Sequence, residues 1–330
     1  MNDRAVSALD AYDIEVQMTR KGRGTIICDT KEGPLVLVPY RGTEAKLLVE
    51  DALLHKIQDA GVAPTDRLLR NKEGNFLTKD TDGGSFILKT YHEGREFDIK
   101  NRRECVEMME LLAKLHEHMT MPTDALSGFA PYSPWKEYEK HNTELRRIYT
   151  YLRGKGQKQC FERRLYEVYR QFSEKAIEAA SQWRYYEEAI NRGGKQNELC
   201  VCHGDYQYHN VLKTNEGICV IHFEKWVVDR KVRDVYLLLR KLMEKNSWNI
   251  ALGKEMLHAY QKISPFSAYD FIDLYYRLAY PEKFWKIANY YYNSPKAWIS
   301  ERNLEKLEAV IQGEEDKARF LREVFQGLIK

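Results

Sequence analysis

The sequence lacks the features that mark membrane and secreted proteins. It contains no run of about 18 apolar residues, so no segment is long enough to cross a bilayer as a helix. Its first residues, MNDRAVSALDAYDIEV, have no basic start followed by an apolar stretch, so no secretory signal is visible. Neither glycine (19) nor proline (9) is enriched among the 330 residues, which argues against a low-complexity chain. These absences predict a globular protein of the cytoplasm.

Cysteine is scarce and unpatterned. The six cysteines include no C-x-x-C pair and no metal-ligand spacing, so neither a disulfide framework nor a zinc site is indicated. Most of them lie in apolar runs, where a thiol packs as a small hydrophobe. We expect reduced, mostly buried cysteines at positions Cys28, Cys105, Cys160, Cys200, Cys202 and Cys219.

Charge is balanced, whereas tyrosine is abundant. A net charge of +3 is too small to indicate a nucleic-acid partner. Most of the 22 tyrosines follow Tyr132, and core packing would explain them; the alternative is an exposed tyrosine surface for assembly or cross-linking. Residues 141–175 are rich in arginine and lysine, which fits either a surface for an acidic partner or a solvated helix face.

The first ninety residues favour a small β-rich lobe with one inserted helix. Residues 43–61 carry apolar positions at helical spacing, with Thr43 as the N-cap and Gly61 as the stop. Short β-branched and apolar runs separated by glycine turns predict strands at residues 14–19, 24–30, 34–40, 67–71 and 85–91.

After residue 91 the pattern becomes mainly helical. An amphipathic helix is expected at residues 103–119, and two long helices between 133 and 190. Residues 198–226 read as strand, loop, strand, turn and strand, and helices follow to the C-terminus. Prolines mark breaks in that last part, at Pro265, Pro281 and Pro295. The sequence therefore predicts an α+β fold with a β-rich lobe over residues 1–90 and a helical lobe over residues 91–330.

One loop in the second lobe carries residues that suit phosphoryl transfer. In CHGDYQYHNVL, Asp205 and Asn210 lie five positions apart between two apolar strands. This spacing can aim the Asp at an acceptor hydroxyl and the Asn at Mg²⁺, while His203 ties the loop together. A polar turn whose Asp and Asn bond only to backbone amides is the simpler reading of such a short motif.

The wider set of motifs resembles a known family. HGDYQYHNVL, VIHFEKW and VRDVYLLLRK resemble the aminoglycoside-phosphotransferase branch of the protein-kinase-like fold. With YHEGREFD, LLAKLHEH and AYPEKFWKIANYYYN, the chain is similar to the CotS family of spore coat proteins. The resemblance implies a bilobal kinase-like fold in which Asp205 is the catalytic-loop Asp, Asn210 a metal ligand and His203 the loop His. It also implies that Asp234 braces that loop, and that SFILKTY, which contains Leu88, supplies the hinge whose backbone holds adenine.

Two departures from the family pattern argue against an active enzyme. The family reads V-I-D-F where this chain has His222 in place of the metal-binding Asp, and imidazole is a poor ligand for Mg²⁺. Strand alternation would place Glu224 one pleat away from that position. The strand of residues 34–40 also has Val38 where the family carries a phosphate-binding Lys.

The missing lysine has consequences for its neighbours. The helix that follows the strand offers Glu44 or Glu50 as the usual ion partner, which we expect to lack a mate. Lys46 or Arg23 could substitute, although each also reads as a solvated cation.

These observations lead to a pseudokinase with a structural or interaction role in the spore coat. We expect synthesis in the mother-cell cytoplasm, other coat proteins as partners, no nucleic acid, no membrane and no cofactor. The alternative is an ATP-dependent phosphotransferase that uses Mg²⁺ or Mn²⁺ in an altered site. A third reading, a module that binds nucleotide without turnover, lies between the two.

Overall fold

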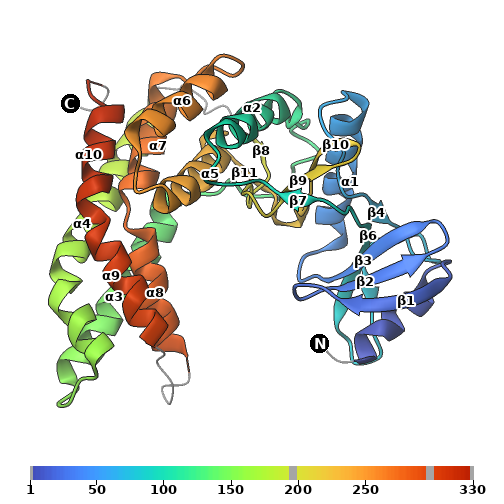
Figure 1. The fold of residues 1–330 in the computed structure, drawn as a ribbon, viewed down its shortest axis with the longest axis horizontal. Coiled ribbons are helices and arrows are strands. Elements are labelled where there is room, and N and C mark those ends of the chain that lie inside the picture. The colour runs from blue at the N-terminus through green and yellow to red at the C-terminus, as the bar shows by residue number, and fades with distance from the viewer. Residues whose placement is uncertain (1–2, 193–198, 295–300, 328–330) are drawn as a thin grey trace. The chain divides into compact units, whose positions relative to one another are not determined.

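Packing divides the chain into two compact units, each built from two segments of sequence. Unit 1 comprises residues 1–129 and 200–228, and unit 2 comprises residues 130–199 and 229–330. The computed structural model describes residues 3–192, 199–294 and 301–327 of the chain (Figure 1). The predicted catalytic loop therefore shares a unit with the N-terminal sheet. The lobe boundary that the sequence predicts after residue 90 stays a prediction.

An antiparallel sheet forms the N-terminal part of unit 1 (Figure 1). Its order is β1-β2-β3-β6-β4, with β5 beside β6. The five predicted strands are confirmed, whereas β5 was not predicted because two residues carry no alternation. The strands are β1 (Val16–Lys21), β2 (Ile26–Thr30), β3 (Gly33–Pro39), β4 (Leu68–Leu69), β5 (Thr78–Lys79) and β6 (Ser85–Thr90).

Both faces of this sheet are covered, because side chains alternate along each strand. Leu37 and Leu88 pack on one face in a cluster with Leu9 of the 3₁₀ helix η1 (Asp3–Ala11). Val38 and Ile87 pack on the other face in a cluster with Leu47 of helix α1 (Glu44–Asp59). The face toward α1 is the one on which the candidate site is built.

Helix α1 begins and ends where the sequence predicts. The Thr43 side chain accepts a hydrogen bond from the Lys46 backbone amide at 3.3 Å, as an N-cap does. Gly61 follows the helix with a φ of 65°, a left-handed conformation that glycine adopts without steric cost.

The rest of unit 1 surrounds the catalytic-type loop. Helix α2 (Arg102–His118) buries the predicted apolar positions, and Asn101 caps its first turn. The three short strands β7 (Arg95–Glu96), β9 (Val211–Thr214) and β10 (Gly217–Val220) form a sheet in the order β10-β9-β7. Strand β8 (Cys200–Cys202) pairs with β11 (Val227–Asp229), and the 3₁₀ turn η2 (Phe223–Lys225) lies between β10 and β11 in sequence.

Unit 2 is helical (Figure 1). Its core is strongly aromatic: Tyr138 stacks on Tyr280 with centroids 3.9 Å apart, and Phe172 stacks on Phe284 at 4.3 Å. Breaks occur as predicted between the first two helices and near Pro265 and Pro281, whereas Pro295 lies outside the described residues. The helices are α3 (Pro134–Gly154), α4 (Cys160–Arg192), α5 (Val232–Lys245), α6 (Ile250–Gln261), α7 (Ala268–Ala279), α8 (Glu282–Asn293), α9 (Glu301–Gln312) and α10 (Glu314–Val324).

The basic segment of α3 and α4 is largely engaged within unit 2. Tyr149 stacks on Tyr166 and Tyr169, with centroids 5.1 and 4.2 Å apart. Arg164 and Lys175 reach Glu308 and Glu314, with shortest N–O distances of 2.7 Å in both pairs. These contacts favour a packed, ion-paired helix face over a surface held open for an acidic partner.

The cysteines are reduced and mostly buried, as the sequence predicts, and the described helices lack a membrane-spanning stretch. All six cysteines are free, and only Cys160 is exposed. None of the helices in the described part of the chain is long and apolar enough to span a bilayer.

A buried charge network holds unit 2 together. Arg277 donates to both carboxylate oxygens of Asp229, at 2.9 and 3.0 Å, and also to Asp273. Arg233 and Arg230 approach the same two carboxylates at 3.4 and 3.7 Å. Because a bidentate guanidinium–carboxylate pair fixes geometry as well as charge, this network fixes α7 against the end of β11.

Replacing Arg277 with leucine should lower the free energy of unfolding by about 3–5 kcal/mol, because Asp229 and Asp273 would stay buried without their main cation. Arg170→Leu, which removes only an exposed pair with Glu174, is the matched control and should cost about 0–1 kcal/mol. Urea unfolding followed by circular dichroism measures both. Similar losses for the two variants would contradict the importance given to the network.

Candidate active site

The catalytic-type loop is held in unit 1 by hydrogen bonds from its own polar residues. His203 is buried; its Nε2 lies 3.0 Å from the Ile221 carbonyl, and its Nδ1 accepts from the Asp205 amide at 3.2 Å. The Asn210 side-chain amide donates to the Asp205 carbonyl at 2.8 Å. Gly204 has a φ of 79°, and a Cβ there would lie 2.1 Å from the Lys225 carbonyl oxygen, so glycine is required. His203 thus braces the loop as expected.

The Asp205 carboxylate already has two partners. Lys225 Nζ lies 2.6 Å from Oδ2, and Gln207 Nε2 donates to Oδ1 at 2.8 Å. The Lys225 side chain is 62% exposed, so this ion pair is screened by water and holds the carboxylate weakly. The predicted base is present, but in this conformation a surface cation neutralises it.

The chain turns sharply where the family pattern has its metal-binding Asp. Strand β10 ends at Val220, and His222 adopts the left-handed conformation with φ 71° and ψ 48°, which is uncommon for a non-glycine residue. Glu224 then lies in η2, and its Oε1 is 2.9 Å from His222 Nδ1. The expectation that strand alternation separates these two residues was wrong, because the strand has already ended.

Lys89 is the functional residue that the sequence analysis missed. On β6 it lies opposite Val36 of β3, on the face toward α1. Its side chain is 0% exposed, and its Nζ lies 2.9 Å from Glu50 Oε1, 3.1 Å from Asp66 Oδ2 and 3.0 Å from Glu224 Oε2. The expectation that Glu50 lacks a mate was therefore wrong. The sequence did offer a signal for this buried cation, namely a single lysine inside the apolar run SFILKTY.

The two strand positions named from sequence do not contribute side chains to this cluster. Val38 carries no charge and packs in the apolar core beside Ile87. Leu88 points to the opposite face of the sheet, and its backbone is flanked by Leu37 of β3 and Leu69 of β4. Leu88 thus lies between two paired strands, and its assignment to an adenine-binding hinge stays a prediction.

The other nominated residues have separate partners. Arg23 pairs with Glu96 at 3.2 Å, and Lys46 Nζ lies 5.3 Å from the Trp226 ring centroid. The Glu44 carboxylate accepts from two backbone amides, those of Phe76 and Leu77, at 2.8 Å each. None of these takes the place of the lysine that the family carries on β3.

Asp234 lies buried in the first turn of α5, as the sequence predicts. It belongs to unit 2, whereas the catalytic-type loop belongs to unit 1. Its role as a brace for that loop therefore stays a prediction.

Burial and charge act in opposite directions on this cluster. Burial raises the pKa of Glu50 to about 7, although Lys89 lowers it in part. Burial alone would lower the Lys89 pKa, but the surrounding carboxylates raise it well above its usual range. For Glu224, burial is outweighed by Lys89 and His222, which hold its pKa well below the usual range. Burial likewise opposes the rise in the His222 pKa that Glu224 produces.

Three side chains around Lys89 have the geometry of a cation site. Asp66, His222 and Glu224 offer ligand atoms that all lie within 4.8 Å of one another. Asp66 Oδ1 is buried with no hydrogen-bond partner among the described residues. However, the ammonium of Lys89 already lies 3.0–3.1 Å from oxygens of two of these residues. The set does not fit resident Mg²⁺, which requires open oxygen ligands in octahedral geometry.

Lys89→Met should lower the free energy of unfolding by about 3–5 kcal/mol, because three carboxylates would lose their shared buried cation. The matched control is Lys79→Met, which changes an exposed lysine of the same sheet and should stay within about 0.5 kcal/mol of wild type. Urea titrations of both variants measure the difference. A loss for Lys89→Met no larger than the control's would show that the cluster does not stabilise unit 1.

Glu50 should make stability depend on pH. Its folded pKa of about 7 exceeds the ordinary value of about 4.3, so the folded state binds the proton more tightly. Its contribution is therefore complete below about pH 4.3 and is lost as the pH rises through about 7. The stability of wild type relative to Glu50→Gln should be greater at pH 5 than at pH 7.5. If the stability of wild type relative to Glu50→Gln instead increases from pH 5 to pH 7.5, Lys89 keeps Glu50 ionised.

Solved structures with similar folds are mainly phosphotransferases and small-molecule kinases. An aminoglycoside phosphotransferase from Alicyclobacillus acidocaldarius matches with a TM-score of 0.80 and 16% identity, covering 97% of this chain and 95% of that one. The amicoumacin kinase hAmiN, in complex with AMP-PNP, Ca²⁺ and Ami, matches with a TM-score of 0.63 and 11% identity over 97% and 94%. Spectinomycin phosphotransferase APH(9)-Ia, in complex with ADP and spectinomycin, matches with a TM-score of 0.60 and 16% identity. The match covers 97% of this chain and 93% of that one. At these identities the likeness shows the kinase-like fold alone.

The sequence comparison gives the family. No curated protein matches the chain. A family model described as "Spore coat putative kinase YutH" matches residues 7–324, nearly the whole length. The chain therefore belongs to the spore coat YutH family, a CotS-like family with an aminoglycoside-phosphotransferase-like fold.

Proposed function

We propose that this protein is a pseudokinase that serves the spore coat as a structural or interaction component. The observation that carries the proposal is the position of Lys89. Its buried ammonium lies within 3.1 Å of carboxylates from α1, the segment before β4, and η2. An internal cation therefore lies 3.0–3.1 Å from oxygens of Asp66 and Glu224, two of the three side chains that could hold a metal ion.

The competition between Lys89 and a metal favours the lysine. A divalent ion would have to share Asp66 and Glu224 with an ammonium that has no exposed path to water. Like charges at such distances repel strongly in a buried site. In addition, His222 presents its Nδ1 to Glu224, which removes that nitrogen as a ligand.

The coat role is supported by family membership and by the neutralisation of the buried carboxylates by Lys89. The family is described as a spore coat putative kinase family, which supports a place in the coat. A kinase fold whose buried carboxylates are neutralised by its own lysine needs no nucleotide to be stable. Its partners would be other coat proteins, with neither nucleic acid nor membrane involved.

A phosphotransferase with altered metal chemistry is the second candidate. Two observations favour it: Lys89 and Glu50 form an ion pair like the one that active protein kinases need, and Asp66, His222 and Glu224 lie within reach of a common ion. Imidazole tolerates Mn²⁺ better than Mg²⁺, so Mn²⁺ would be the preferred metal.

Thermal unfolding with excess ATP separates the two candidates. The pseudokinase should show no change in melting temperature with ATP alone, with Mg²⁺ or with Mn²⁺. A ligand at a hundredfold excess over its Kd would add about 2.7 kcal/mol of stability, which is easily detected. A metal-dependent increase with ATP would contradict the pseudokinase, and phosphate transfer that is lost in Asp205→Asn would support the phosphotransferase.

A variant that restores the family pattern provides the positive control. Val38→Lys, Lys89→Val and His222→Asp together return the lysine to β3 and the carboxylate to the turn after β10. We expect this triple variant to gain stability from ATP and Mg²⁺, whereas the single variant Val38→Lys should not, because Lys89 stays in the cluster. If the folded triple variant gains nothing, the internal cation is not what closes the site.

A further inference from the structure

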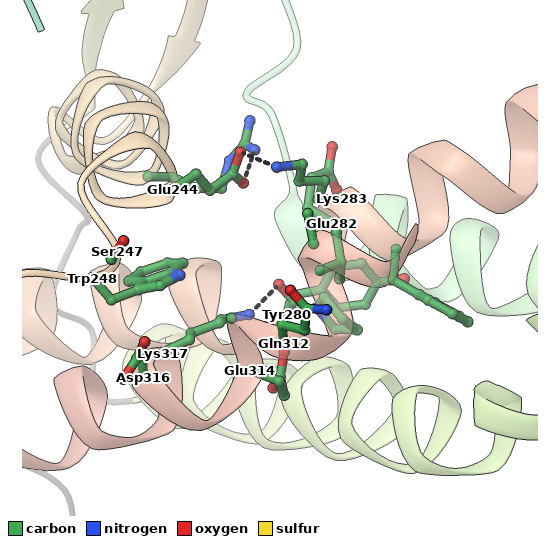
Figure 2. Close-up of a pocket in the computed structure, with 16 residues that line it drawn as sticks. Glu244, Ser247, Trp248, Tyr280, Glu282, Lys283, Gln312, Glu314, Asp316 and Lys317 are labelled. Atoms are coloured by element: carbon green, nitrogen blue, oxygen red, sulfur yellow. Dashed lines mark hydrogen bonds and ion pairs between the residues drawn. The ribbon is translucent and has the colours of Figure 1, made fainter. Parts of the chain in front are cut away.

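Unit 2 contains a pocket that the kinase-type site does not use. It has a volume of about 330 Å³ and lies where the end of α5, the α7–α8 junction and the α9–α10 junction meet (Figure 2). The motif AYPEKFW contributes its wall through Tyr280, Pro281 and Phe284. Every residue that lines the pocket lies between Arg240 and Lys317, so none comes from the catalytic-type loop.

The pocket presents hydrogen-bond donors. Lys317 is only 9% exposed, and its ammonium donates to the carbonyls of Ala279 and Tyr280 at 3.2 and 3.3 Å. Arg240 is 5% exposed, and its Nε is buried without a hydrogen-bond partner among the described residues. Figure 2 shows Lys317 between Trp248 and Tyr280, with Glu244 and Lys283 paired at the opposite end.

The carboxylates around the pocket are occupied by other cations. Glu314 pairs with Lys175 at 2.7 Å, and Glu282 pairs with Lys286 at 3.0 Å. Asp316 pairs with Arg319, and Glu244 alone serves both Arg240 and Lys283. Lys317 forms no ion pair within 4 Å among the described residues, so its ammonium has no carboxylate partner in the pocket.

Two helices begin at the same place without a side-chain cap. Helix α8 starts after Pro281, and α10 starts after Gly313, and both of these residues line the pocket. Uncapped helix N-termini carry free amide donors and a partial positive charge, which favour an anion. The buried, unpartnered Arg240 Nε is a separate sign of a missing acceptor.

Trp248 supplies an aromatic wall. It adopts φ 51°, directly after Ser247 with φ 48°, a left-handed pair that is costly for a bulky residue. Its ring packs edge-on against Phe320 at 5.4 Å and lies 5.9 Å from Lys317 Nζ. The indole therefore lies next to the Lys317 ammonium, and its packing against Phe320 compensates for a costly backbone conformation.

We propose that this pocket binds a small organic anion with a planar ring. Its carboxylate or phosphate group contacts Lys317 and the helix N-termini, and its ring packs against Trp248. The volume is at the small end of the range for ligand sites, about 300–1,000 Å³, which suits a single ring with one charged group.

Binding of benzoate and phenyl phosphate to the full chain tests the proposal, by calorimetry and by tryptophan fluorescence at constant ionic strength. At least one of the two should bind and should change the fluorescence, and Trp248→Phe should abolish that change. Lys317→Met should weaken binding about tenfold or more, because a charge-assisted contact is lost. The matched control is Lys254→Met on the exposed side of α6, which removes a lysine that does not line the pocket and should bind as wild type does.

Three results would overturn the proposal. The first is that neither compound binds, and the second is that Lys317→Met binds as tightly as wild type. The third is that inorganic phosphate binds as tightly as phenyl phosphate, because the ring would then contribute nothing. If Lys317→Met does not fold, the fluorescence change in wild type and its loss in Trp248→Phe decide the matter. These ligands contain no nucleotide, so the result is independent of the ATP experiment on the Lys89 site.

Discussion

The ammonium of Lys89 is the interaction on which unit 1 depends. It joins the sheet to Glu50 of α1, to Asp66 before β4 and to Glu224 after β10. Three carboxylates gathered in a buried place would repel one another, and they are stable there only because one cation serves all of them. The sheet, the helix and the turn that carries His222 are therefore positioned by a single charge.

That arrangement changes the meaning of the two departures from the kinase pattern. A lysine absent from β3 is replaced by one from the neighbouring strand β6, on the same face of the sheet. A carboxylate absent at His222 is replaced by Glu224, which the left-handed turn brings beside it. The lysine and the carboxylates at these positions thus neutralise one another. This internal neutralisation supports a coat component whose fold is that of a kinase.

In unit 2, buried carboxylates are likewise neutralised by one cation, here an arginine. Arg277, with its planar guanidinium, serves Asp229 and Asp273 through several hydrogen bonds at once. Both units therefore contain a buried cation with carboxylate partners from distant parts of the sequence. The pocket beside Lys317 differs, because its carboxylates pair with other cations and the Lys317 ammonium donates only to backbone carbonyls.

The sequence by itself determined the local elements and the motifs. Periodicity and caps placed α1 and α2, the turn glycines separated the strands, and HGDYQYHN identified a loop that His203 ties together. Asn210 bonds the Asp205 carbonyl, and its role as a metal ligand stays a prediction. The family also followed from the sequence, because its motifs are local runs of residues. The tertiary structure alone decided the partner of Glu50, the proximity of Asp66 and the position of Glu224. These depend on strand register and on a left-handed residue at 222, since pairs 39 and 135 positions apart leave no periodic signal in the chain.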